Sequence, residues 1–381
     1  MKKKIAIIGA SYLQEPLIQK AKSMGLETHV FAWAAGDVGE KSADVFYPIS
    51  IVEKDQILEK CREIGIDGIC TIASDLAAIA VNYVAENMGL TGNSMACTLV
   101  STNKHAMRRC FEEHGDPSPK SLRVSNAEEL DTDRLTFPVI VKPMDRSGSR
   151  GITKVLKAGD LPAAIEYAKA QGFEKYALVE EYAEGTEYSV EYISWKGEHR
   201  FLALTRKYTT GAPDFIETGH MEPADVSTEL LARVQSVVEH ALTSLGIQYG
   251  ASHSELKISK DGVIRIIEIG GRMGGDNIGS ALVQLTTGYD FVKAVVETAL
   301  GQEPEEKKTK QACAGIHFIF NEKDLAVLER LKEEHPEYLV EEDIHEITDE
   351  KVTDSGSRFG YFMFAADSRK EIEAYLPEDQ E

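Results

Sequence analysis

Two glutamates that lie thirteen residues apart are the strongest candidates for metal chemistry in the sequence. Glu255 and Glu268 stand in two predicted strands on either side of a turn at residues 260–262. If both face the same side of this hairpin, their carboxylates converge, and two buried carboxylates coexist only when a cation or a proton separates them. Two surface glutamates are the alternative, but Glu268 lies in an apolar run where a bare carboxylate is costly. Carboxylate oxygens favour Mg²⁺ as the cation.

A lysine followed by a loop of small residues predicts an anion site. Lys142 lies at the end of a predicted buried strand, where its charge is costly unless it meets an anion. Glycines let backbone N–H groups turn inward and serines add hydroxyl donors. The loop contains two residues each of glycine, serine and arginine: Arg146, Ser147, Gly148, Ser149, Arg150 and Gly151. An exposed loop is the alternative, but the basic residues in so acidic a chain favour phosphate binding.

A third group of residues could act on the substrates. Arg272 follows Glu268 by four residues and could reach a developing phosphoryl charge, or form a salt bridge with one of the two glutamates. In the segment 215–223, Glu217 could bind an ammonium group, and His220 could donate to an oxyanion or shuttle a proton. Because the segment contains a glycine and a proline, a solvated turn is the alternative.

The elements that would position these residues change in pattern near residue 100. Before it, short apolar strands alternate with helices, which implies a doubly wound parallel sheet. Gly9 ends the first strand, but Ser11 and Gln14 replace two glycines of the dinucleotide-binding fingerprint, so a structural turn is favoured over a dinucleotide site. After about residue 100, we predict a helix at 103–114, strands on either side of the glycine loop within 137–205, and a second helix at 230–245. A hairpin at 252–269 and a small α+β segment at 316–364 follow.

Composition narrows the class of protein. The 381 residues include 42 basic and 63 acidic side chains, a net charge of −21, and so negative a surface repels nucleic acid and anionic lipid. The five cysteines form no C-x-x-C pair, which favours reduced, mostly buried thiols over a zinc ribbon or a disulfide framework. The first apolar run is too short for a signal peptide, and no stretch approaches the roughly 20 apolar residues of a membrane span. We therefore expect a cytoplasmic protein.

The order and spacing of these groups resemble the ATP-grasp superfamily of carboxylate–amine ligases over about residues 1–300. The resemblance implies an α/β fold class with a Rossmann-like N-terminal parallel sheet, an ATP-grasp fold of two α+β lobes and a small C-terminal α+β piece. The corresponding domains are expected at residues 1–100, 101–305 and 306–381. The cofactors implied are ATP and Mg²⁺, with Mn²⁺ as a substitute.

Matched position by position, the resemblance assigns roles to the candidates for nucleotide binding. Lys104 and Lys142 are similar to the family's two phosphate lysines. The loop formed by Ser147, Gly148, Ser149 and Gly151 is similar to the glycine loop that closes over the β- and γ-phosphates. The residues Glu180, Glu181, Tyr182 and Ala183 are similar to the family's adenine-binding hinge. Glu187 matches the family's ribose-binding acid.

The resemblance also covers the chemistry. Glu255 and Glu268 match the Mg²⁺ carboxylates, and Arg272 matches the arginine near the transferred phosphoryl group. The segment 215–223 is similar to the E-x-G-H segment of bacilysin-type L-amino acid ligases, in which the acid and the histidine, here Glu217 and His220, line the pocket for the amino substrate and the phosphorylated intermediate. One position departs from the pattern: Gly270 stands where the family usually places an asparagine.

The function implied is an ATP-dependent ligase that activates a carboxylate as an acyl phosphate and joins it to an amine. An amino acid or another small carboxylate is the expected substrate. Carboxylation through carboxyphosphate is the first alternative, and the segment 215–223 argues mildly against it. A nicotinamide-dependent oxidoreductase is a second alternative, which the missing glycines of the fingerprint disfavour. A nucleotide sensor without turnover is a third, which the intact set of charged residues disfavours. A homodimer is an open expectation, because the first and last domains offer apolar faces of a kind that commonly pair.

Overall fold

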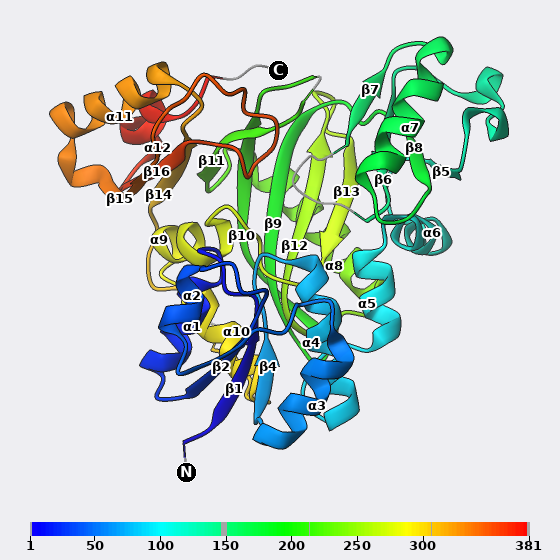
Figure 1. Ribbon diagram of the computed structural model, residues 1–381. Helices are drawn as coiled ribbons and strands as arrows, with labels where there is room; N and C mark the ends of the chain where they lie inside the picture. Colours follow the sequence, from blue (N-terminus) through cyan, green and yellow to red (C-terminus); the bar gives the residue numbers. More distant parts are fainter. Residues whose placement is uncertain (1, 146–150, 213, 306, 379–381) are drawn as a thin grey trace.

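A computed structural model describes residues 2–145, 151–212, 214–305 and 307–378. Its N-terminal part is a parallel sheet in the order β3-β2-β1-β4. The short apolar strands are buried because helices cover the sheet (Figure 1). The strands are β1 (Lys4–Ile8), β2 (Glu27–Phe31), β3 (Val45–Tyr47) and β4 (Gly68–Cys70), and the helices α1 (Glu15–Ser23), α2 (Val38–Ser42), α3 (Lys54–Ile64) and α4 (Asp75–Met88). The predicted doubly wound sheet is confirmed.

The turn after β1 is filled by a side chain of the protein itself. Gly9 has a φ of +104°, and a Cβ added there would meet Gln14 Oε1 at 2.8 Å. Gln14 accepts from the Ser11 hydroxyl at 2.8 Å and donates to the carbonyl of Ile72 at 2.8 Å. The side chain of Gln14 therefore packs against Gly9 and takes the space that a β-carbon would need.

The largest sheet has eight antiparallel strands in the order β13-β12-β9-β10-β11-β14-β16-β15. One face packs on α8 (Thr228–Ser244), whose buried Val234 and Val238 meet Tyr192 and Leu256 in one core. The strands are β9 (Thr186–Trp195), β10 (Glu198–Thr209), β11 (Glu217–Glu222), β12 (Tyr249–Ile258), β13 (Ile264–Gly270), β14 (Cys313–Phe318), β15 (Leu339–Ile344) and β16 (Gly360–Ala366). The other face is polar over part of its area and carries the site described below.

A third, smaller sheet forms a separate lobe beside the large one (Figure 1). Its order is β5-β8-β6-β7, and α7 packs on it through Leu161 and Ile165. The elements are β5 (Ser121–Val124), β6 (Val139–Pro143), β7 (Thr153–Val155), α7 (Leu161–Gln171) and β8 (Ala177–Glu181), preceded by α5 (Met95–Thr102) and α6 (Lys104–His114). Asn103 caps α6, because its side chain accepts from the N–H of Ala106 at 3.0 Å.

Two later segments join parts of the chain that are distant in sequence. The C-terminal strands extend the large sheet, because β14 pairs with β11, and α11 (Glu322–Glu334) and α12 (Arg369–Ile372) complete that end. After α9 (Val283–Thr287), α10 (Phe291–Ala299) shares its core with β1 and α1 of the N-terminal sheet. Residues 217–222, for which a solvated turn was the alternative, form the central strand β11. Among the described residues, no helix has both the length and the apolarity needed to span a bilayer.

Candidate active site

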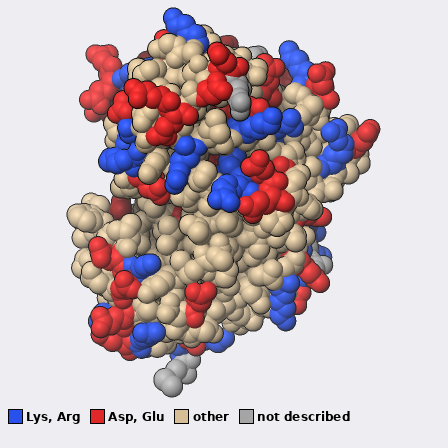
Figure 2. Space-filling view, turned by 90° about the vertical axis from the view of Figure 1, so that its right-hand side faces the viewer, with Lys and Arg blue, Asp and Glu red and all other residues tan. Residues whose placement is uncertain are grey.

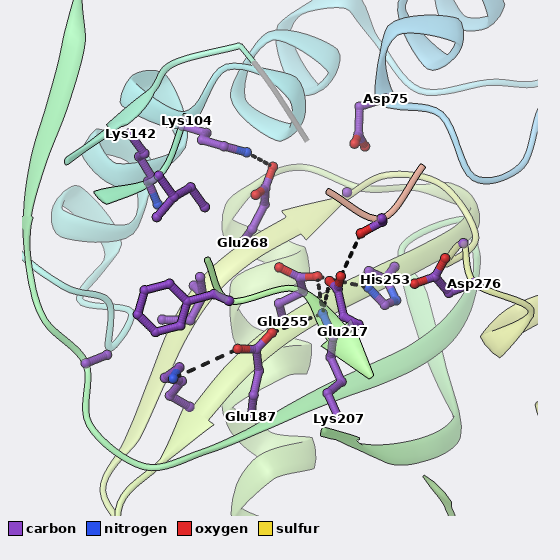
Figure 3. A pocket seen from close by; sticks show the side chains of 18 of the residues that line it. Asp75, Lys104, Lys142, Glu187, Lys207, Glu217, His253, Glu255, Glu268 and Asp276 are labelled. Carbon is purple, nitrogen blue, oxygen red and sulfur yellow. Dashed lines mark hydrogen bonds and ion pairs between the residues drawn. The ribbon is translucent and has the colours of Figure 1, made fainter. Parts of the chain in front are cut away.

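A cavity of about 320 Å³ lies between the small lobe, the large sheet and the N-terminal sheet. Figure 3 shows Lys104 and Lys142 toward one side of it and Glu217 and Asp276 toward the other. Most of the residues predicted for the site line this cavity: Lys104, Lys142, Glu180, Glu181, Tyr182, Ala183, Glu187, Glu217, His220, Glu255, Glu268 and Arg272. The fold therefore brings these residues together in one cavity, although they span more than 160 positions of the chain.

The period of two residues in β-strands places the polar side chains on one face of the large sheet. His253, Glu255 and Lys257 alternate along β12, and all three line the cavity. Across the sheet, Glu255 lies opposite Glu268 on β13 and opposite Ser189 on β9. The predicted convergence of the two glutamates therefore results from direct register pairing across the hairpin.

Each of these two carboxylates contacts a lysine ammonium from another element. Lys207 Nζ on β10 lies 2.8 Å from Glu255 Oε1, and Lys104 Nζ contacts Glu268 Oε1. Burial alone would raise the pKa of Glu255, but Lys207 and His253 outweigh it and hold the pKa well below its usual value. For Lys207, the surrounding carboxylates outweigh burial and raise its pKa well above the usual value. The floor of the cavity therefore carries fixed charges of both signs.

The donor set of this floor fits a hard divalent cation. Glu255 and Glu268 supply carboxylate oxygens to one cavity, their side chains are only about a quarter exposed, and each attracts a positive charge there. Among the described residues, no group of three or more His, Cys, Asp or Glu side chains is arranged to hold a metal ion. A cation bound by these two carboxylates would thus take its remaining oxygens from a ligand or from water, as Mg²⁺ commonly does.

Lys142 belongs to a buried ion cluster at the edge of the small lobe. Its Nζ lies 2.5 Å from Glu180 Oε2, and Arg108 Nε donates to Glu180 Oε1 at 2.9 Å. Burial opposes the charge of Glu180, but Arg108 and Lys142 outweigh burial and lower its pKa to about 2. Burial, assisted by the nearby Arg108 and Lys104, lowers the pKa of Lys142 despite Glu180. One carboxylate thus faces two cations, and the cluster presents net positive charge to the cavity.

The residues of the predicted hinge come directly after Glu180 in the chain. Glu181 ends β8 with its side chain about half exposed, and Tyr182 and Ala183 continue along the cavity wall. Lys154 Nζ lies 3.6 Å from the centroid of the Tyr182 ring, a cation–π contact that links the hinge to β7. Glu187 is the second residue of β9, and its carboxylate lies 3.0 Å from Lys207 Nζ.

The predicted glycine loop is described only at its end. Ser147, Gly148 and Ser149 lie outside the described residues. Gly151 has a φ of +71°, and an added Cβ would meet Pro143 Cγ and Gln171 Cβ at 2.9 Å. The end of the loop is therefore packed closely against β6 and α7, a position that only glycine fits without strain.

A second charged group lines the opposite end of the cavity. Glu217 Oε2 accepts from the Ser355 hydroxyl at 2.8 Å, and its Oε1 lies 3.3 Å from Lys207 Nζ. Arg358 donates to both oxygens of Asp276 at 2.6 and 3.0 Å, which keeps the pKa of Asp276 far below its usual value despite burial. The large sheet and the C-terminal segment together build this end.

His220 is wholly buried in the wall between these groups. Neither of its ring nitrogens has a hydrogen-bond partner among the described residues, and Nε2 lies 3.6 Å from Asp276 Oδ2. Burial lowers its pKa, and the nearby Asp276 only partly offsets this effect. A neutral imidazole with an unused nitrogen at a cavity wall can donate to, or accept from, a bound ligand.

Several site residues were not predicted from the sequence. Lys257 stands between the apolar Leu256 and Ile258 on β12, which is a usable signal for a polar sheet face. Lys207 lies next to Arg206 on β10 and carries no such alternation. Asp75 follows the end of β4, where ligands of parallel sheets commonly bind, so its position was also readable. Ser355 and Arg358 carry no local signal, because only the pairing of β14 with β11 brings their segment to the cavity.

Comparison with known proteins gives this geometry a family. Residues 135–280 match the family model described as ATP-grasp domain. This part of the chain is similar to an ATP-grasp domain. The match covers β6 to the loop after β13, and it therefore includes Lys142, Glu180, Glu255 and Glu268.

Two curated proteins that the chain resembles are ligases. The chain is 27% identical over 293 residues to a D-alanine–D-alanine ligase of Ralstonia nicotianae, covering 73% of this chain and 82% of that protein. It is 26% identical over 246 residues to an alanine–anticapsin ligase of Bacillus subtilis, covering 59% of this chain. The second match spans only 52% of the relative's length.

Solved structures confirm the fold of the whole chain. An L-amino acid ligase from Bacillus licheniformis superposes with a TM-score of 0.83 at 22% identity, covering 100% of this chain and 99% of that chain. A phosphoribosylglycinamide synthetase from Anaerococcus prevotii gives a TM-score of 0.78 at 20% identity, covering 98% and 96%. The expected arrangement of a Rossmann-like sheet, an ATP-grasp fold and a C-terminal α+β segment is confirmed.

Proposed function

We propose that this protein is an ATP-dependent carboxylate–amine ligase that forms an amide bond through an acyl phosphate. The observation that carries the proposal is the composition of one cavity. Lysines and two paired carboxylates line one part of it, and an acid and a buried histidine with unused nitrogens line another. Its volume of about 320 Å³ suits small molecules rather than a macromolecule.

ATP would bind along the small lobe. The hinge at residues 180–183 would contact adenine, Glu187 the ribose, and Lys104 and Lys142 the phosphates. A phosphate group would replace the Glu268 carboxylate as the partner of Lys104, while Arg108 would keep Glu180 paired. Mg²⁺, or Mn²⁺, held by Glu255 and Glu268, would neutralise charge on the phosphates. Positioning and charge neutralisation are the main contributions that a protein makes to phosphoryl transfer.

Two steps account for the products. An oxygen of the substrate carboxylate attacks the γ-phosphorus of ATP, the bond to the β-phosphate oxygen breaks, and ADP leaves. The amine then attacks the acyl carbon, inorganic phosphate leaves, and the ammonium proton is lost to give the amide. Arg272 would stabilise the charge on the transferred group. Glu217 would hold the amine substrate, and the neutral His220 would donate to the tetrahedral oxyanion or carry a proton.

A phosphate-release screen tests the proposal. Amino acids and small carboxylates would be supplied in pairs with Mg-ATP, and each component would also be omitted in turn. We expect phosphate release that needs both a carboxylate and an amine, together with a condensed product in the mass spectrum. ATP turnover indifferent to both would contradict the proposal. Bicarbonate-dependent release without an amine would instead favour carboxylation through carboxyphosphate.

The cellular setting belongs to the same proposal. The five cysteines are free, and four of them are buried. Burial raises the pKa of Cys61, Cys70 and Cys97 to about 12, so these thiols resist oxidation, as expected for a cytoplasmic enzyme. Acidic and basic side chains are intermixed on the face shown in Figure 2.

A homodimer remains part of the proposal, and light scattering at micromolar concentration would decide between a monomer and a dimer.

A further inference from the structure

Asp75, from the N-terminal part of the chain, forms an ion pair with Arg272 in the cavity. Asp75 begins α4, and both of its carboxylate oxygens accept from Arg272, from Nε and from Nη2, each at 2.8 Å. The two side chains are each less than one-fifth exposed, and both line the cavity. Two parallel hydrogen bonds fix the plane of a guanidinium group as well as its distance.

The backbone on both sides of this pair is joined as well. The N–H of Ala73 donates to the carbonyl of Met273 at 3.1 Å, and Arg272 Nη1 donates to the same carbonyl at 3.2 Å. Ala73 has a φ of +60°, a left-handed conformation that is unfavourable for a residue with a side chain. Ser74 then caps α4 by accepting from the N–H of Ala77 at 3.2 Å. A strained turn and a helix cap thus present Asp75 to Arg272.

Gly270 provides the space that the pair occupies. A Cβ added at Gly270 would lie 2.7 Å from Asp75 Oδ1 and 3.2 Å from Arg272 Nε. The side chain that the family usually carries at this position could not coexist with the pair as it stands. The glycine at position 270, where the family usually has an asparagine, is therefore what allows Asp75 and Arg272 to pair in this geometry.

The pair leaves part of the guanidinium available. Arginine has five N–H donors. Two of them go to Asp75 and one goes to the Met273 carbonyl, so two remain on a group that lines the cavity. We propose that Asp75 is a positioning residue that aims these remaining donors of Arg272 at the transferred phosphoryl group, in the space left by Gly270. This inference rests on the proposed ligase function and adds a dependence of the reaction on the N-terminal sheet.

Three single variants separate positioning from simple structural support. Asp75→Asn keeps the shape but removes the second acceptor, and Gly270→Ala places a methyl group against the pair. Gly271→Ala is the matched control, because its Cβ would meet nothing nearer than Ser101 Oγ at 3.4 Å. We expect the first two variants to lower kcat by about 10- to 100-fold with KM for ATP within about twofold of wild type, and the control to be unaffected.

The double variant Asp75→Asn/Gly270→Ala provides the decisive comparison. Because both changes break the same pair, the double variant should lose no more activity than the more damaged single variant. Losses that multiply, an unchanged kcat in Asp75→Asn, or an effect confined to KM would each overturn the inference. If Asp75→Asn fails to fold, the kcat of Gly270→Ala still decides.

A measurement without substrates distinguishes this inference from the proposed function. Melting temperatures of Asp75→Asn, Arg272→Lys and the double variant form a cycle that needs no turnover. We expect the second change to cost clearly less once the first is present, because the pair is already broken. An additive cycle would overturn the pair itself, whereas an absent ligase activity in wild type would overturn the proposed function and the role built on it but would leave the pair standing.

Discussion

Glu222 offers a test of how the polar face of the sheet is built. It is wholly buried at the end of β11, where its carboxyl group accepts from the Thr205 hydroxyl at 2.8 Å and from the Thr286 hydroxyl. Burial raises its pKa to about 7, the two hydroxyls and Lys308 oppose this shift, and Glu191 adds to it. The folded protein therefore keeps a proton on Glu222 that an unfolded chain would lose near pH 4.5.

The sign and size of the effect follow from this difference. At 1.36 kcal/mol for each pKa unit, a pKa raised from 4.5 to about 7 corresponds to about 3 kcal/mol. The contribution of Glu222 to stability is fully present below pH 4.5 and is lost as the pH rises through 7. Glu222→Gln cannot ionise. The variant should exceed wild type in free energy of unfolding by about 3 kcal/mol at pH 8 and by about 1 kcal/mol at pH 5.

Urea unfolding followed by intrinsic fluorescence at the two pH values measures this difference. Glu333→Gln, a change at an exposed residue of α11, serves as the control and should show no such dependence on pH. A glutamine variant that is no more stable than wild type at pH 8 would refute the reasoning. So would a stability gain of the same size at both pH values, because it would not come from ionisation.

The remaining predictions concern the proposed nucleotide and metal sites. Glu268→Ala should abolish turnover while the melting temperature stays within a few degrees of wild type, and near-normal activity would remove the metal assignment. Lys142→Ala should weaken ATP affinity about 10- to 100-fold in calorimetry, since Arg108 still pairs with Glu180 and the fold persists; unchanged affinity would exclude the phosphate role. Lys207→Met should cost about 3–5 kcal/mol in urea unfolding because three carboxylates lose their common partner, and added Mg²⁺ should restore part of that loss; an undiminished stability would contradict the charge balance.

The sequence predicted those parts of the site that depend on local geometry. The hairpin that carries Glu255 and Glu268 was predicted from its turn, and the structure places the two glutamates opposite each other. Their pairing needs a register shift between Glu255 and Leu256, because the register set next to the turn would place Ile267 opposite Glu255. The helix predicted at 103–114 is present as α6, Lys104–His114. The N-terminal sheet followed from the alternation of short apolar strands with helices.

The parts that escaped prediction depend on contacts between distant segments. A solvated turn was the alternative for the segment at 217–222, because its glycine and the proline that follows it are common in turns, and pairing with β10 and β14 makes it a central strand instead. Arg358 reaches Asp276 only through that pairing. Asp75 meets Arg272 across 197 positions of sequence. Local propensity carries no information about such long-range pairings.

Lys207 explains how so many acids share one cavity. Its Nζ lies 3.0 Å from Glu187, 2.8 Å from Glu255 and 3.3 Å from Glu217. Under the proposed function, these carboxylates serve the ribose, the metal and the amine substrate, so one buried cation contacts all three subsites. A metal ion arriving at Glu255 would compete with Lys207 for that carboxylate and leave the lysine more fully available to the other two. Occupation of the metal site would thereby change the charge felt by the amine substrate at Glu217, which couples nucleotide binding to acceptor binding through a single side chain.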